Sequence, residues 1–169
     1  MMNSEFQALI NDAEDHYLQS QELRQLKQQL ESLPARLAAY EVLRDRELEV
    51  FQAVADELQA EFANLPTSLI NRALENGLAI LRCGAMAMLQ NNPEHVQKRL
   101  LDWLPEQVKA YDLVAVEDQM LQLLQAQLTK RIESVHVAQI QPYIEQVRLA
   151  LVSETPASKR AQAPAMALG

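Results

Sequence analysis

Apolar residues recur at spacings of three and four along most of the chain, a period that is typical of α-helices with one buried face. The first such stripe is short and consists of Phe6, Leu9, Ile10 and Ala13. It ends near Tyr17, and Ser20 with Glu22 then has the pattern of an N-cap followed by a first-turn carboxylate. A second helix is therefore predicted from Ser20 to about Ser32, where Pro34 should interrupt it.

The longest helical pattern lies between Ala35 and Phe62, where neither glycine nor proline occurs. Its apolar stripe consists of Leu48, Phe51, Ala55, Leu58 and Phe62. Because helices of this length in globular domains usually bend or break, a corner is predicted in the charged residues 44–47.

Prolines and asparagines mark the ends of the remaining predicted helices. Pro66 opens one that the residues at 91–93 close, and Pro105 divides the next one beside Trp103. A further helix carries Met120, Leu121, Leu124 and Leu128. The last helix is predicted over about 137–152.

The composition favours an all-α fold. Leu, Ala, Gln and Glu dominate the 169 residues and only 3 glycines occur, which favours helices over sheets and tight turns. The length suits one domain, predicted over residues 1–153, in which residues 1–33 form a two-helix arm. Residues 154–169 have no helical period and are predicted to be a flexible tail.

The charge and the single cysteine narrow the function classes. A net charge of −8 argues against nucleic-acid binding, because phosphate neutralisation requires a surplus of Lys and Arg. Cys83 has no partner for an internal disulfide. Neither a signal-peptide pattern nor an apolar run of about 18 residues occurs, so we expect a cytoplasmic protein without membrane insertion.

Catalytic and metal-binding patterns are sparse. His16, His95 and His136 have no second ligand at a typical metal spacing, so surface histidine is the favoured interpretation and an axial haem ligand the alternative. Cys83 lies far from any histidine or helix N-terminus and is predicted to be a buried small hydrophobe. Because no set of nucleophile, base and oxyanion donor appears, the protein is not expected to be an enzyme.

Glu75 and Arg82 are the informative polar residues of the helix that contains Cys83. They are seven residues apart, so they lie near one face but are too distant to form a strong mutual pair. Two interpretations stay open: both side chains point into solvent, or they meet partners outside the helix.

Four short segments, in order along the chain, resemble motifs of phycobiliprotein subunits. INDAEDHYLQSQEL (residues 10–23) is similar to the N-terminus of that family, where an aspartate precedes an aromatic-Leu pair and LSSxEL. RLAAYEVL (36–43) resembles RLxAAxxL, FQAVADELQAEFANLP (51–66) resembles IVxxAxxxLFxxxP, and PYIEQVRLAL (142–151) resembles PYFDYIIQAL. The resemblance implies a globin-like fold with two extra N-terminal helices that mediate dimerisation.

The segment that binds the chromophore in that family differs in this chain. The family signature is Cys-x-Arg-Asp followed by Tyr-Leu-Arg, in which Cys forms a thioether to a linear tetrapyrrole, Arg binds its propionate and Asp its pyrrole nitrogens. The corresponding segment here is NRALENGLAILR, residues 71–82. Matching the final Leu-Arg leaves Ala73, Glu75 and Asn76 at the Cys, Arg and Asp positions, whereas matching the glycine leaves Arg72, Leu74 and Glu75 there.

In both registers the attachment cysteine is absent, and the family's loop over the chromophore is missing as well. The resemblance therefore implies a vestigial tetrapyrrole pocket, formed by Arg72, Ala73, Glu75, Asn76 and Trp103. No covalent bilin is expected, while noncovalent binding of a tetrapyrrole remains an alternative.

The resemblance also implies a homodimer. Its predicted interface residues are Asp12, Tyr17, Leu18 and Arg82. Asp12 of one chain is expected to pair with Arg82 of the other, because the family pairs an aspartate and an arginine at these positions across its interface. Such a charge-assisted pair would specify the register between protomers more than it would add stability.

The chain is similar to chromophore-free relatives of phycobiliproteins, the bilin-biosynthesis-associated globins of cyanobacteria. This implies a non-catalytic protein that acts by association in bilin or tetrapyrrole metabolism or in phycobilisome biogenesis. The expected partner is a tetrapyrrole-biosynthesis enzyme or a phycobiliprotein. Two alternatives remain: a noncovalent carrier or sensor of bilin, haem or porphyrin, and a structural subunit of a phycobilisome-type assembly.

Overall fold

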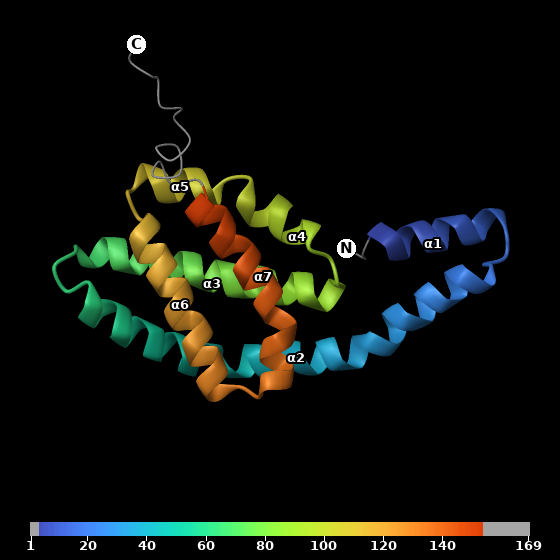
Figure 1. Ribbon diagram of the computed structural model, residues 1–169, viewed down its shortest axis with the longest axis horizontal. Coiled ribbons are helices and arrows are strands. Elements are labelled where there is room, and N and C mark those ends of the chain that lie inside the picture. The colour runs from blue at the N-terminus through green and yellow to red at the C-terminus, as the bar shows by residue number, and fades with distance from the viewer. Residues whose placement is uncertain (1–3, 154–169) are drawn as a thin grey trace, which may run out of the picture.

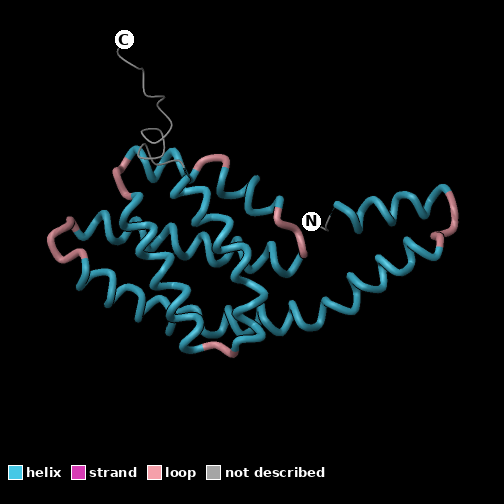
Figure 2. The backbone as a smooth tube through the Cα atoms, in the orientation of Figure 1, coloured by secondary structure: helices cyan, strands magenta, loops and turns pink. Residues whose placement is uncertain are grey.

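Helices account for nearly all of the computed structural model, which describes residues 4–153 (Figures 1 and 2). The elements are α1 (Ser4–Asp15), α2 (Ser20–Glu61), α3 (Thr67–Gln90), α4 (Glu94–Val96), the π-helical turn η1 (Gln97–Leu101), α5 (Leu104–Ala110), α6 (Val114–Arg131) and α7 (Ser134–Ser153). No strand occurs within 4–153, so the prediction of an all-α fold is confirmed.

The helices form a body and an arm (Figure 1). In the body, the second half of α2 packs with α3, α6 and α7, and α4 and α5 lie at one edge. The first half of α2 extends away from the body, and α1 folds back along it. The largest fully buried side chains all belong to the body: Leu58, Ile80, Leu81, Met88, Leu104, Leu113, Met120, Leu121, Leu124, Leu128, Ile140 and Ile144.

The predicted interruption at Pro34 is wrong, because α2 continues through this residue. Pro34 lacks the N–H that would pair with the Leu30 carbonyl, and its ring crowds the preceding turn. Ser32 Oγ and Arg36 Nη2 both donate to the Gln29 carbonyl at 3.0 Å, and Arg36 Nη1 donates to the Leu89 carbonyl at the end of α3. Side-chain donors and a contact with the body thus stabilise the proline-containing turn.

The charged residues 44–47 are not a break either, although Figure 1 shows that α2 bends in its middle. Leu43 and Val50 are buried on either side of them, so packing against the body holds the helix together across the charged turn. The N-cap is also one residue earlier than predicted. Gln19 occupies it, and its backbone N–H donates to Glu22 Oε2 at 2.6 Å.

The other predicted elements agree with the structure to within a few residues. Pro66 precedes α3, and Asn91 ends it in the left-handed conformation with φ of 50°. Pro105 lies in the first turn of α5, and the four apolar residues named for α6 are all buried. The predicted tail, residues 154–169, lies outside the described residues, as do the first three residues of the predicted arm.

Candidate functional site

The residues of the predicted tetrapyrrole pocket point in different directions from α3. Ala73 is fully buried and Asn76 is 8% exposed, whereas Glu75 is exposed and Arg72 is half-buried. Helix geometry explains the split, because positions 73, 76 and 80 are three and four apart and share the face that packs on the body. The buried members therefore face the core and Glu75 faces solvent.

Asn76 makes its contact inside the core. Its amide Nδ2 donates to Glu117 Oε1 of α6 at 2.5 Å, and Glu117 is completely buried. The second carboxylate oxygen of Glu117 has no hydrogen-bond partner in the structure. Burial raises the pKa of Glu117 to about 8, against a smaller lowering by the Asn76 hydrogen bond, so the group is mostly protonated at neutral pH.

Gly77 lets α3 approach its neighbours closely beside this pair. A Cβ at this position would lie 2.5 Å from Met120 Sδ and 3.1 Å from Phe51 Cε1, both closer than ordinary van der Waals contact. The side chain of Met120 is fully buried and occupies the space that a larger residue at 77 would need. In this structure α2, α3 and α6 therefore interdigitate around the position where the resemblance places the chromophore segment.

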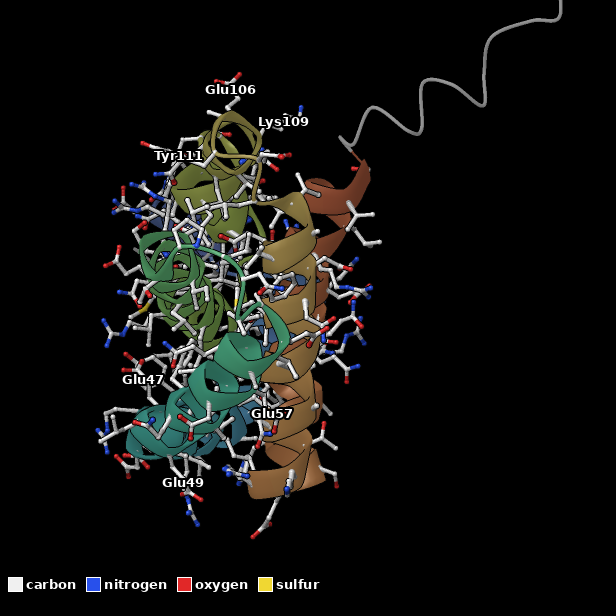
Figure 3. All side chains as sticks on the ribbon, turned by 90° about the vertical axis from the view of Figure 1, so that its left-hand side faces the viewer. Glu47, Glu49, Glu57, Glu106, Lys109 and Tyr111 are labelled. Carbon is white, nitrogen blue, oxygen red and sulfur yellow. The ribbon has the colours of Figure 1, made fainter. Side chains whose placement is uncertain are left out.

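The remaining two pocket residues make surface contacts at the α5 end of the body. The Arg72 guanidinium carbon lies 3.9 Å from the centre of the Tyr111 ring, a cation–π contact that the sequence did not suggest. Trp103 is 43% exposed and donates its Nε1–H to the Arg99 carbonyl at 2.7 Å. Figure 3 shows Tyr111 near this end of the molecule, together with the exposed Glu106.

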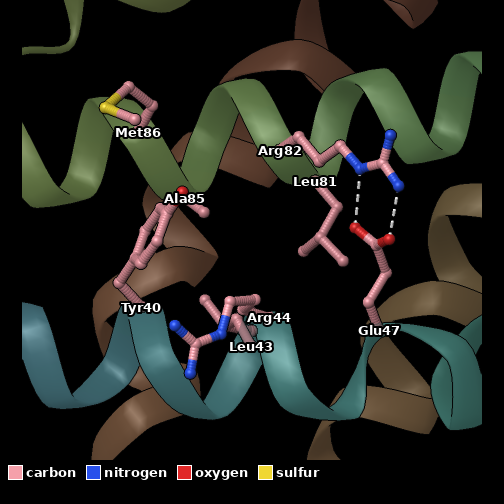
Figure 4. Close-up of a pocket in the computed structure, with 8 residues that line it drawn as sticks. All are labelled: Tyr40, Leu43, Arg44, Glu47, Leu81, Arg82, Ala85 and Met86. Carbon is pink, nitrogen blue, oxygen red and sulfur yellow. Dashed lines mark hydrogen bonds and ion pairs between the residues drawn. The ribbon is translucent and has the colours of Figure 1, made fainter.

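The predicted interface residues divide between the arm and the body. Asp12 and Glu22 line a hollow of about 470 Å³ between α1 and α2. Tyr17, in the turn that joins these helices, is 98% exposed, and Leu18 beside it is half-buried. Arg82 lies on α3 and forms a bidentate pair with Glu47 of α2, with Nε–Oε2 at 2.8 Å and Nη2–Oε1 at 2.5 Å (Figure 4).

Arg82 also borders a hollow of about 370 Å³, which we call the α2–α3 hollow (Figure 4). Its lining from α2 is Tyr40, Leu43, Arg44 and Glu47, and its lining from α3 is Leu81, Arg82, Ala85 and Met86. Apolar side chains thus meet two guanidinium groups and one carboxylate. The sequence drew attention to Arg82 alone, because the other members become neighbours only when two distant helices pack.

A row of exposed leucines on α2 was also missed. Leu23, Leu26, Leu30, Leu33 and Leu37, here called the leucine seam, alternate spacings of three and four. The exposed fractions are 51% for Leu23, 52% for Leu30, 41% for Leu33 and 46% for Leu37, and Leu26 is half-buried. The spacing itself was the available signal, since alternation of three and four is the pattern of helices that pair along a seam.

The reactive side chains give little support for a catalytic or metal-binding site. Burial raises the pKa of the Cys83 thiol, so it is a poor nucleophile at neutral pH, and its half-buried side chain packs against the core. Within residues 4–153 no group of three His, Cys, Asp or Glu side chains is placed to hold a metal ion. Over the same residues, no helix is both long enough and apolar enough to cross a bilayer.

Comparison with known proteins gives one family. The family model described as "Phycobilisome protein" matches residues 9–151, which is most of the chain. No curated protein matches the chain.

Proposed function

The chain belongs to the phycobilisome protein family, with its all-α, globin-like fold, and we propose that it acts by protein association in bilin metabolism or phycobilisome biogenesis. In this proposal it is a non-catalytic, cytoplasmic member that carries no covalent bilin.

The observation that carries this proposal is the environment of α3 at the chromophore position. The chain's single cysteine, Cys83, stands beyond the segment that would need it. Asn76 is engaged with the buried Glu117 at 2.5 Å, and Met120 packs against Gly77. Protein side chains therefore fill the space beside this segment, which supports a role without a pigment there.

The arm supports association as the mode of action. Four leucines of the seam are more than 40% exposed and recur along one face of α2, on an element that leaves the body, and Tyr17 in the preceding turn is 98% exposed. Contiguous exposed apolar surface on a folded protein is typical of protein interaction sites. We propose a homodimer in which Asp12 of one chain pairs with Arg82 of the other.

A tetrapyrrole titration tests the absence of a pigment site. Absorbance spectra of the purified protein should be unchanged when biliverdin or haemin is added at micromolar concentration. The noncovalent carrier predicts a shifted band with an affinity that Arg72→Ala or Glu75→Ala reduces, while Glu106→Ala at an exposed position of α5 serves as the control. Such a band would replace the association role with the carrier.

Sedimentation tests the dimer. Asp12→Arg and Arg82→Asp should each shift the protein toward monomer, and the double swap should restore the dimer because the pair is rebuilt with reversed charges. A wild-type protein that is monomeric at about tens of micromolar would contradict the homodimer.

The identity of the bound partner distinguishes a role in bilin metabolism from a role as a structural subunit. Co-purification with a soluble tetrapyrrole-biosynthesis enzyme supports a role in bilin metabolism. Co-purification in trimeric or larger assemblies with phycobiliproteins supports the structural-subunit alternative.

A further inference from the structure

We propose that α2 contains a hinge at Pro34, and that Arg36 is the latch that holds the arm at its angle to the body. The arm here is α1 together with the first half of α2. This inference concerns the single chain and does not depend on the proposed homodimer. It states that the arm has a second orientation, which it reaches when the contacts of Arg36 open.

Apolar packing does little to fix the direction of the arm. The first buried side chain of α2 is Ala39, and no side chain between Ser20 and Ala38 is buried. In the body half of the same helix, Leu43 and Val50 are buried. A helix without a buried face keeps its direction through its own hydrogen bonds and through the polar contacts that it makes.

The hydrogen-bond ladder of α2 is weakest at Pro34. Proline has no N–H, so the Leu30 carbonyl lacks its helical donor, and the ring crowds the turn before it. Sharp bends within helices occur mostly at proline for these reasons. Pro34 lies shortly before Ala39, so the weak turn falls where the arm leaves the body (Figure 1).

Arg36 joins this weak turn to the body. Its Nη1 donates to the Leu89 carbonyl in the last turn of α3, and its Nη2 donates to the Gln29 carbonyl at 3.0 Å. The last carbonyls of a helix carry partial negative charge and lack helical donors, so a guanidinium is a suitable partner for them. One side chain thus binds a carbonyl of the arm, before the proline, and a carbonyl of the body.

A second hydrogen bond joins the same two parts. Asn91 Nδ2, at the C-cap of α3, donates to Gln29 Oε1 at 3.1 Å. Beside these contacts lies a hollow of about 420 Å³. Its lining is Gln28, Gln29, Ser32, Ala35, Arg36, Asn91 and Gln139. The junction is therefore polar and leaves space into which the arm can move.

The closed latch has a cost that opposes its hydrogen bonds. Arg36 Nε is buried without a hydrogen-bond partner. Burial also lowers the pKa of the Arg36 guanidinium, against a smaller raising by Tyr143 of α7. A buried N–H without an acceptor offsets much of what a neighbouring hydrogen bond contributes. Opening returns Nε to water, so the closed and open orientations lie close in free energy.

The latch determines how the leucine seam is presented. Leu30 and Leu33 precede the hinge, whereas Leu37 follows it. With α2 continuous through Pro34, these exposed leucines share one face of one helix. A bend at Pro34 would change the angle between the two parts of the seam. Arg36 is therefore a positioning residue, which keeps the seam a continuous surface.

Distances between spin labels test the hinge directly. In a Cys83→Ser background, labels are attached at Gln21→Cys on the arm and at Thr129→Cys on an exposed position of α6. The labelled protein is diluted into excess unlabelled protein, so that only distances within one chain are measured. Arg36→Gln should at least about double the width of the distance distribution. Arg24→Gln, at an exposed position of the arm, is the matched control and should leave the width unchanged.

Pro34→Ala separates the hinge from the latch. Alanine supplies the N–H that the Leu30 carbonyl lacks, so the double variant with Arg36→Gln should return to the wild-type width although the latch is absent. A double variant as broad as Arg36→Gln alone would place the bend elsewhere and overturn the hinge. Wild-type width in Arg36→Gln, with helicity retained by circular dichroism, would overturn the latch.

Gln29→Ala keeps the test decisive if Arg36→Gln folds poorly. This change removes the hydrogen bond from Asn91 and leaves the guanidinium of Arg36 in place. It should broaden the distribution less than the loss of Arg36 does, by about 1.5-fold, because one neutral hydrogen bond is lost. Wild-type width in Gln29→Ala, when Arg36→Gln does not fold, would likewise overturn the latch.

Discussion

The two halves of α2 use the same kinds of residue in opposite ways. In the body half, Val50, Val54 and Leu58 are completely buried between α3, α6 and α7. In the arm half, Leu30 and Leu37 are about half exposed although they occupy equally regular helical positions. An apolar stripe on a helix therefore identifies a face that packs against another surface, and only the fold determines whether that surface belongs to the same chain.

The body also differs from the arm in its polar groups. In the body, the amide of Asn76 donates to one carboxyl oxygen of Glu117 inside the core, and the other carboxyl oxygen is buried without a partner. In the arm, the carboxylates of Asp12 and Glu22 line an open hollow. Asn76 and Glu117 thus face the core, whereas the polar groups of the arm lie at a surface that another molecule can reach.

The largest expected effect comes from truncating a leucine in each half of α2. Leu58→Ala should lower the free energy of unfolding by about 2 to 5 kcal/mol, because it removes buried methyl groups and leaves a cavity. Leu30→Ala should change it by less than about 0.5 kcal/mol in dilute solution, where a dimer contributes little. Urea denaturation followed by circular dichroism measures both values.

The same pair of variants should show the reverse order in sedimentation. Leu30→Ala should weaken self-association, whereas Leu58→Ala should leave it near the wild-type value at temperatures where the body is folded. An equal loss of unfolding free energy in the two variants would mean that the arm leucines belong to the core of one chain, and the contrast between the halves would fail.

The next effect is the pH dependence that Glu117 gives to the body. The unfolded chain releases the proton of this residue near its ordinary pKa of 4.5, whereas the folded chain holds it until about pH 8. The folded state therefore binds the extra proton between these values, and stability falls as pH rises through the window. The expected loss between pH 5 and pH 8 is about 2 to 4 kcal/mol.

Glu117→Gln is the variant that isolates this contribution. Its amide oxygen can still accept the Asn76 hydrogen bond but has no proton to lose, so the variant should be more stable than wild type at pH 8 and similar to it at pH 5. Glu106→Gln, at an exposed position, is the control. The dependence of its unfolding free energy on pH, measured by urea denaturation at each pH, should be that of wild type. If Glu117→Gln has the same pH dependence as wild type, the buried carboxyl is not the source of that dependence.

A smaller effect on stability should follow from adding a side chain to α3 where it approaches α2 and α6. Gly77→Val should lower the free energy of unfolding by about 1 to 3 kcal/mol, because its side chain would displace Met120 and Phe51 from a filled space. Gly84→Ala is the comparison for this variant. Its Cβ would lie 3.2 Å from Ile140 and 3.5 Å from Tyr143, which is less crowded than at Gly77. Alanine also favours a helix more than glycine does. A Gly77→Val protein as stable as wild type would indicate an open space beside α3 and would favour the carrier.

The sequence predicted the helices well and their contacts only in part. Periodicity located the body helices because each buries one face, and Pro66 and Asn91 marked the ends of α3. It failed at Pro34, where donors from Ser32 and Arg36 support the turn, and Arg36 also contacts the last turn of α3. A local pattern cannot show a contact between residues this far apart in the sequence.

The candidate site was predictable only where one helix contains it. Asn76 and Arg82 were recognised from the α3 motif, but Glu117 and Glu47 were not, since each reaches its partner from another helix. The leucine seam was visible in the spacing, yet its exposure is a property of the fold. Residues that act through tertiary neighbours thus need the structure to be identified.

The smallest expected effect concerns the pair that joins the two regions, Glu47 with Arg82. The Arg82 side chain is 65% exposed, so Glu47→Gln should change the free energy of unfolding by less than about 1 kcal/mol. Its effect on association is the sharper measurement. In one chain Glu47 occupies one edge of the guanidinium, through Nε and Nη2, so the partner's Asp12 must bind at Nη1 beside this carboxylate or replace it.

Glu47→Gln should tighten the dimer by a few fold, because it removes a carboxylate that competes with the Asp12 of the other copy for Arg82. Glu49→Gln removes a carboxylate on the same helix that pairs with Arg46 at 2.5 Å, and it should leave the dimer unchanged. Analytical ultracentrifugation at low ionic strength measures both, since screening would mask a difference of this size. A weaker dimer in Glu47→Gln would mean that Glu47 orients Arg82 toward the interface. A contact within the body would then support association, and the contrast between body and arm would not hold for this pair.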